Sequence, residues 1–203
     1  MAKPLALNQP YTFSEFFELK VEVDELVAEF GYSLTRKWLH LPQYTGELDR
    51  LEELKERVEE VLPYVNLANE ATRREVLIAP VVIDLVHYTH AQLRIEYPIK
   101  VTQQLQGYFD YLLRTQTSLL VVKAKQEDLT NGFTQLAAEL IALDLWTNST
   151  QQSELIGAVT TGSIWQFGVL HRATKQIDQG LNSYRVTEDL DPLMRIFVKA
   201  LLN

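Results

Sequence analysis

Gly107-Tyr-Phe-Asp-Tyr-Leu-Leu113 and Ser118-Leu-Leu-Val-Val-Lys-Ala-Lys125 are the two stretches that decide how this chain folds. Both are short and rich in apolar or aromatic residues, which is typical of β-strands, and only a short loop separates them. Strands joined in this way run antiparallel. Side chains two positions apart on a strand share a face, so Lys123 and Lys125 are expected to point toward Asp110 on the neighbouring strand.

The sequence on either side places these strands between two helices. Residues 93–101 alternate apolar and polar side chains, which predicts a third strand and an antiparallel meander. Before the third strand, apolar residues recur with helical spacing from Asn69, a good N-cap residue, to about Tyr88, and Pro80 is expected to kink this helix or to remove one of its hydrogen bonds. After the strand over 118–125, residues 129–145 show the same helical spacing.

The remaining segments extend this arrangement at both ends. Helices are predicted from Thr12, over 23–30 and over 48–62, with a strand or extended arm over 32–41. Strands are predicted over 154–159, 163–170 and 175–185, followed by an amphipathic terminal helix over 191–202. The sequence therefore predicts an α/β fold with an α+β-like order of elements, in which helices flank a mixed sheet.

Composition limits the chemistry that the chain can perform. The 203 residues are 46% hydrophobic, enough for one substantial domain, and they include no cysteine, which excludes disulfides and thiolate metal sites. The net charge of −8 repels polyanions and so weighs against non-specific nucleic-acid binding. The amino terminus has no basic and apolar leader, and the longest apolar stretch is shorter than a membrane span. These features predict a cytoplasmic protein.

The segment from about Asn69 to Leu143 resembles the PD-(D/E)XK nuclease superfamily, in particular the restriction-endonuclease-like domains of bacterial proteins and of type I restriction motor subunits. The resemblance rests on four pieces in the family's order: the helix start Asn69-Glu-Ala-Thr-Arg73, the strand with Asp110, the strand that ends at Lys125, and Gly132-Phe-Thr-Gln-Leu136. It implies a restriction-endonuclease-like core over 65–203, with residues 1–64 as an N-terminal helical extension packed on it.

The resemblance also implies a reaction and a set of site residues. The family hydrolyses DNA phosphodiesters with Mg²⁺, a cation that prefers oxygen ligands. The implied metal ligands are Glu70, Asp110 and the backbone carbonyl of Ala124. Lys125 would assist the attacking water, and Gln135 would position water or substrate. Many enzymes of this superfamily act as two-fold dimers, so a homodimer is compatible with the resemblance.

Lys123 is the departure from the family's pattern, because it stands where the second acid is expected. An ammonium about 4 Å from a dication, at an effective dielectric constant of about 20, repels it by roughly several kcal/mol. Three outcomes are open: catalysis is lost; another carboxylate such as Glu70, Glu96 or Glu139 substitutes; or the cluster binds phosphate without metal. Lys123 could also replace the metal by pairing with Asp110 or Glu70.

Two hypotheses of function follow from this departure, and whether the chain is an enzyme stays open between them. The first is a Mg²⁺-dependent nuclease acting on DNA, or a degenerate relative of one. The second is a non-catalytic protein that keeps the nuclease fold as a binding or assembly module.

Overall fold

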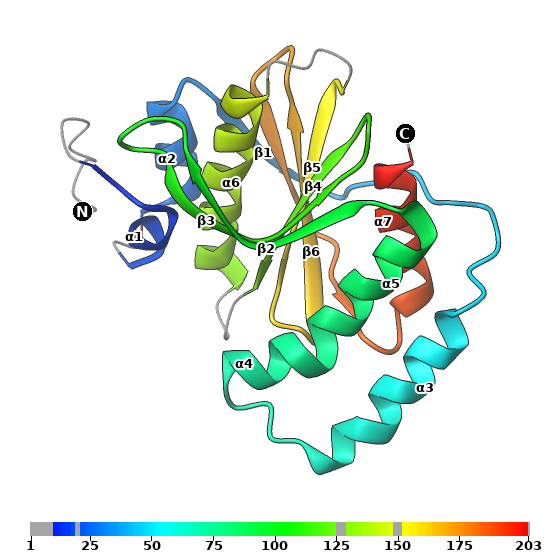
Figure 1. The fold of residues 1–203 in the computed structure, drawn as a ribbon. Coiled ribbons are helices and arrows are strands. Elements are labelled where there is room, and N and C mark those ends of the chain that lie inside the picture. Colours follow the sequence, from blue (N-terminus) through cyan, green and yellow to red (C-terminus); the bar gives the residue numbers. More distant parts are fainter. Residues whose placement is uncertain (1–9, 19–20, 125–128, 148–151, 203) are drawn as a thin grey trace.

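The computed structural model describes residues 10–18, 21–124, 129–147 and 152–202. One mixed sheet lies in the middle of the molecule, with helices packed on both of its faces (Figure 1). This arrangement confirms the predicted α/β class with a mixed sheet flanked by helices. No helix among the described residues is long and apolar enough to cross a membrane.

The elements follow the predicted order. The helices are α1 (Phe13–Glu18), α2 (Val23–Glu29), α3 (Leu51–Val61), α4 (Glu70–Arg73), α5 (Ala79–Thr89), α6 (Leu129–Trp146) and α7 (Leu190–Leu201), with short helical turns η1 (Leu62–Tyr64) and η2 (Arg74–Ile78). The strands are β1 (Ser33–Lys37), β2 (Gln92–Lys100), β3 (Gln106–Arg114), β4 (Leu119–Ala124), β5 (Glu154–Thr160), β6 (Ile164–His171), β7 (Gln176–Gly180) and β8 (Tyr184–Arg185).

The sheet has the strand order β1-β7-β6-β5-β4-β3-β2, and β8 pairs with β6. The predicted meander of β2, β3 and β4 is antiparallel throughout. Helix α6 then crosses over, so that β5 runs parallel to β4, and β6 and β7 return antiparallel. Helix α6 therefore packs against both β4 and β5.

The predicted helix over 69–88 begins where expected and contains an irregular turn. The Asn69 side chain accepts a hydrogen bond from the Thr72 amide at 2.7 Å, which is an N-cap. The helix widens into the π-helical turn η2 just before Pro80, because proline has no amide with which to continue the regular bonding. The irregular turn therefore lies directly before the position at which Pro80 is expected to disturb the helix.

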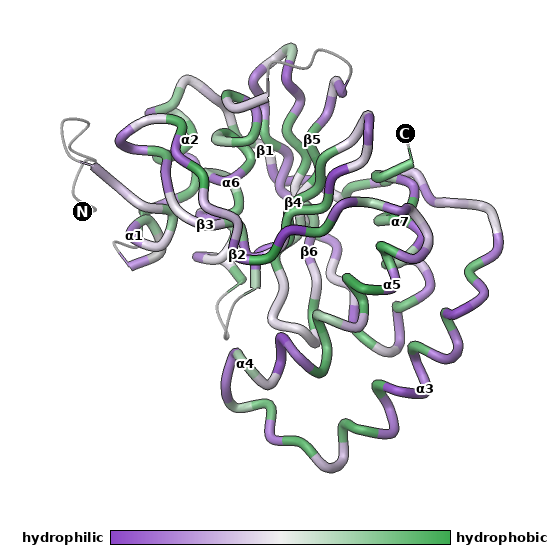
Figure 2. Tube along the Cα trace, viewed as in Figure 1, coloured by the Kyte–Doolittle hydropathy of each residue, from purple (hydrophilic) through white to green (hydrophobic). Residues whose placement is uncertain are grey.

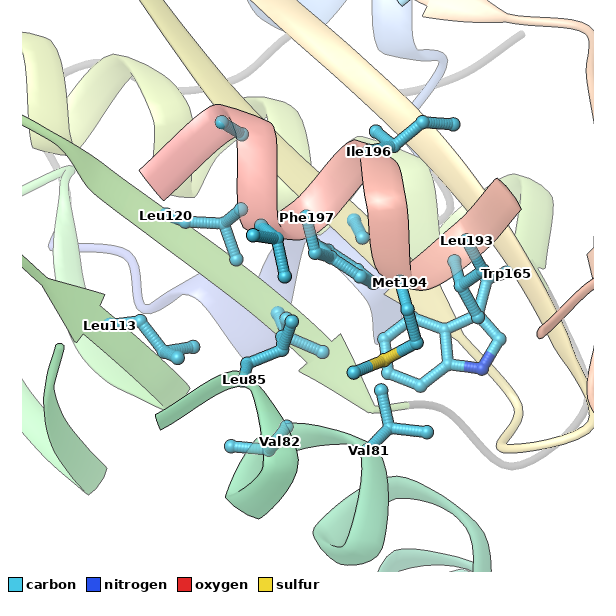
Figure 3. Packing of buried hydrophobic residues seen from close by; sticks show 14 of the residues in the cluster. Val81, Val82, Leu85, Leu113, Leu120, Trp165, Leu193, Met194, Ile196 and Phe197 are labelled. Carbon is cyan, nitrogen blue, oxygen red and sulfur yellow. The ribbon is translucent and has the colours of Figure 1, made fainter. Parts of the chain in front are cut away.

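Two apolar layers hold the helices against the sheet. Residues from α5 and α7 pack on one face of the sheet (Figure 3), and α1, α2 and α6 pack on the other. Along β4 the layers alternate, since Leu120 and Val122 belong to the α7 layer and Val121 to the α6 layer. This alternation puts Lys123 on the α6 face.

Helix α6 lies unusually close to the sheet because two paired strand positions have no side chain. Gly157 on β5 lies opposite Gly168 on β6. A Cβ atom at Gly157 would stand 2.8 Å from Leu136 Cδ1, and one at Gly168 would stand 2.9 Å from the Phe133 ring. Residues 132–143 of α6 are all buried, polar ones included, because the sheet covers one side of the helix and α1 and α2 cover the other.

The first 64 residues contribute to the central sheet as well as packing on it. The segment predicted as a strand or arm contains β1, which pairs in parallel with β7 at one edge of the sheet. Helices α1 and α2 pack on α6 through Phe13, Phe16 and Leu26, which are fully buried. The division of the chain into an extension over 1–64 and a core over 65–203 stays a prediction.

Candidate functional site

Asp110 and Lys123 face one another across adjacent strands. The register pairs Tyr111 with Val122 and Leu112 with Val121, and its continuation sets Asp110 against Lys123. The Lys123 Nζ atom lies 2.8 Å from Asp110 Oδ1, and both residues are more than 90% buried. The backbone amide of Ala124 donates to Asp110 Oδ2 at 2.8 Å. The two carboxylate oxygens of Asp110 therefore each have a donor.

Helix α6 adds two polar side chains to the pair. Gln135 and Glu139 are four residues apart and so lie on the same face of the helix, toward the sheet. Glu139 is fully buried, and its Oε1 atom is 3.4 Å from Lys123 Nζ and 3.4 Å from Gln135 Nε2. We call Asp110, Lys123, Gln135 and Glu139 the lysine cluster.

The charge of Lys123 is set by two opposing effects. Burial disfavours the ammonium form, but the carboxylates of Glu139 and Asp110 outweigh burial, and the pKa of Lys123 is raised. The side chain is therefore an ammonium throughout the neutral range. It supplies one positive charge between two carboxyl groups that come from different layers of the fold.

The lysine cluster does not fit a divalent metal ion as it stands. Mg²⁺ takes oxygen ligands at about 2.0–2.1 Å in octahedral geometry. Here the ammonium already lies at hydrogen-bond distance from Asp110 and close to Glu139, in the position where a bridging cation would have to sit. Within the described ranges, no group of three or more His, Asp or Glu side chains could hold a metal ion.

The other expected site residues are placed differently. Glu70 is the first residue of α4, and its carboxylate forms no hydrogen bond or ion pair with any residue that the structure describes. Glu96 is engaged with Arg74 Nη1 at 2.7 Å, and Arg74 also reaches the Tyr111 hydroxyl at 3.4 Å. Lys125 lies outside the described residues. The structure thus joins Asp110, Lys123 and Gln135, and of the three alternative carboxylates it adds Glu139.

A second polar cluster was not anticipated from the sequence. Asp178 on β7 is 99% buried and accepts hydrogen bonds from Lys37 Nζ at 2.6 Å and Gln176 Nε2 at 2.8 Å. His171 lies between two carboxylates, with Nε2 2.5 Å from Asp178 Oδ2 and Nδ1 3.0 Å from Glu154 Oε1. We call these five residues the histidine cluster.

The histidine cluster joins four strands at the β1 end of the sheet. Burial favours the neutral form of Asp178, but the donors on Lys37, Gln176 and His171 outweigh it, and the pKa of Asp178 is lowered. A cavity of about 400 Å³ opens beside the cluster, with Trp38 and Pro42 in its wall. The one sequence signal was an aspartate inside a short predicted strand, a few residues after a histidine that ends the preceding strand.

Comparison of the chain with known protein-family models gives no match, and comparison with curated proteins gives none either.

Proposed function

We propose that this chain is a non-catalytic protein that keeps a restriction-endonuclease-like fold as a binding or assembly module. The observation that carries this proposal is the position of the Lys123 ammonium, 2.8 Å from Asp110 Oδ1 and 3.4 Å from Glu139 Oε1. A cation fixed to the protein takes the place in which the implied nuclease reaction needs Mg²⁺.

The order of elements supports the fold part of the proposal. The helical segment 70–89, the antiparallel strands β3 and β4 and the helix α6 follow one another in the order of the four pieces on which the resemblance rests. Asp110 lies on β3, Lys123 on β4, and Gln135 on the helix that follows. Each implied residue that the structure describes is thus on the expected element, although Glu70 does not reach the cluster.

Physical reasoning supports the loss of catalysis. A dication entering beside the Lys123 ammonium would be repelled by roughly several kcal/mol. Removing the lysine's proton would relieve that repulsion, but the two carboxylates raise the pKa of Lys123 and hold the proton in place. The alternative function is an active Mg²⁺-dependent nuclease with DNA as its substrate, in which Glu139 would replace the missing acid.

A plasmid cleavage assay with Mg²⁺ or Mn²⁺ separates the two functions. We expect no cleavage by the parent chain. Cleavage by the parent that is abolished in Asp110→Ala would establish the nuclease and end the proposal. Cleavage that survives Asp110→Ala would come from another source, since Asp110 is the acid on which every metal-dependent version of this site depends. Lys123→Glu tests whether Lys123 is the reason for the missing cleavage, because it restores the acid that the family has at this position.

A further inference from the structure

A groove with apolar walls runs between α3 and the helical segment formed by η2 and α5. Its volume is about 300 Å³. Val58 and Val61 line it on α3, and Val76, Pro80 and Ile83 line it on the other side, where they are spaced four and three residues apart. Each wall is therefore one apolar stripe of a helix.

Two apolar side chains that line this groove are exposed to solvent. Ile83 is 58% exposed and Val61 is 40% exposed, and Val76 and Pro80 are partly exposed. Single exposed apolar residues are ordinary on a protein surface. Two that lie on opposite walls of one groove indicate a place where another apolar surface packs. In Figure 2, apolar and polar residues alternate along α3, as expected for a helix with two faces.

The polar rim of the groove is acidic. Helix α3 carries five glutamates against one lysine and one arginine. Arg57 lines the groove, but it is paired with Asp84 across it at 3.3 Å. Glu53 and Glu60 are four residues before and three residues after Arg57, so they lie along the same side of α3. Glu75 lines the opposite wall and is exposed. An entering partner therefore meets apolar walls and a negatively charged rim.

We propose that this groove binds an amphipathic helix of another protein. Its apolar stripe would enter between Val61 and Ile83, and its lysines or arginines would face Glu53, Glu60 and Glu75. The lining residues span 57–61 on α3 and 75–83 on the other wall, which is roughly 12 Å along the longer wall, so the groove matches about two turns of the bound helix. A second copy of this chain fits less well, because a symmetric contact through the groove would oppose two acidic rims.

This inference deepens the proposed function by naming a class of partner, and it rests on that function only in taking binding as the role of the chain. The groove and the lysine cluster share no residue. Failure of the peptide to bind would therefore not change the conclusion about Lys123. Nuclease activity of the parent chain would not change the conclusion about the groove.

The test uses a synthetic helical peptide of about 18 residues with leucine at positions i, i+3, i+4 and i+7 and lysine elsewhere. Two controls are a scrambled peptide of the same composition and a peptide with glutamate in place of lysine. Calorimetry on the full chain should detect saturable binding of the first peptide alone. Ile83→Asp should weaken it at least about tenfold, whereas Leu181→Asp, which changes another exposed apolar residue, should not.

The charged rim is tested separately. Glu60→Lys should weaken binding several-fold at low salt and less at high salt, whereas Glu18→Lys on α1 should have no effect. Circular dichroism checks that each variant is folded. Equal binding of the scrambled peptide, or unchanged binding by Ile83→Asp, would overturn the proposal. Self-association of the parent chain that Ile83→Asp abolishes would also overturn it, because a second copy would then occupy the groove.

Discussion

The lysine cluster and the histidine cluster both join strands through opposite charges, but they differ in their access to water. In the lysine cluster, the side chains of Lys123, Asp110 and Glu139 are 7%, 10% and 0% exposed. In the histidine cluster, Asp178 is buried, whereas the side chains of Lys37 and Glu154 are about half exposed. The same ion-pair chemistry therefore has different consequences for stability, depending on whether solvent can replace a lost partner.

The largest effect is expected where solvent cannot replace the lost cation. Lys123→Met removes the ammonium and leaves Asp110 and Glu139 side by side in the interior. We expect a loss of roughly 3–5 kcal/mol in the free energy of unfolding near neutral pH, because breaking a buried pair leaves an uncompensated charge. Urea denaturation measures it. A loss below about 1 kcal/mol would show that Lys123 does not form a buried ion pair with Asp110 and Glu139.

Asp178→Asn should have a smaller effect at the other cluster. The carboxylate is buried and accepts from Lys37, Gln176 and His171, so the change weakens several charge-assisted hydrogen bonds. The amide keeps one acceptor oxygen, and water reaches the exposed partners. We expect a loss of roughly 1–3 kcal/mol by urea denaturation at neutral pH. A loss equal to that of Lys123→Met would contradict the distinction between the clusters.

The two clusters should also lose their contributions to folding stability at opposite ends of the pH scale. The folded pKa of Asp178 is lowered, so its contribution is present above the unfolded value of roughly 3.9 and is lost as pH falls through the folded value. The folded pKa of Lys123 is raised, so its contribution is present below roughly 10.4 and is lost as pH rises through the folded value.

Unfolding curves of the parent and both variants across pH check this assignment. Asp178→Asn should flatten the acid limb of the stability profile and leave the alkaline limb unchanged. Lys123→Met should flatten the alkaline limb. A steep acid limb that persists in Asp178→Asn would assign the acid sensitivity to other carboxylates.

The smallest effect is expected for Lys37→Ala. Its ammonium lies 2.6 Å from Asp178, but its side chain is 47% exposed, and exposed pairs contribute little after screening by salt. We expect a change below about 1 kcal/mol, decreasing further with added salt. A salt-independent loss of several kcal/mol would mean that water does not reach this end of the sheet.

The sequence allowed the lysine cluster to be predicted in part. Side chains two positions apart on a strand share a face, which predicts that Lys123 points toward Asp110 on the neighbouring strand. Glu139 was one of three candidate carboxylates, since a helical pattern does not say how closely the helix approaches the sheet. That approach depends on Gly157 and Gly168, which lie on the two strands that follow α6 and not on the helix itself. Glu70 was expected at the cluster and is not in contact with it.

The histidine cluster could not be predicted in the same way. It requires β1 to pair in parallel with β7, although about 140 residues separate the two strands. Periodicity indicated both strands, but it carries no information about which strands become neighbours. Lys37 and Asp178 meet only because of that long-range pairing, so neither had a local signal for its partner.

The central claim is that the Lys123 ammonium replaces a metal ion, and Mn²⁺ binding tests it most directly. Titration of Mn²⁺ followed by electron paramagnetic resonance should show no saturable site in the parent chain. Lys123→Glu should gain one site, and Asp110→Ala in that background should lose it. A site in the parent chain that disappears in Asp110→Ala would contradict the account, because the metal and the ammonium could not then occupy the same place.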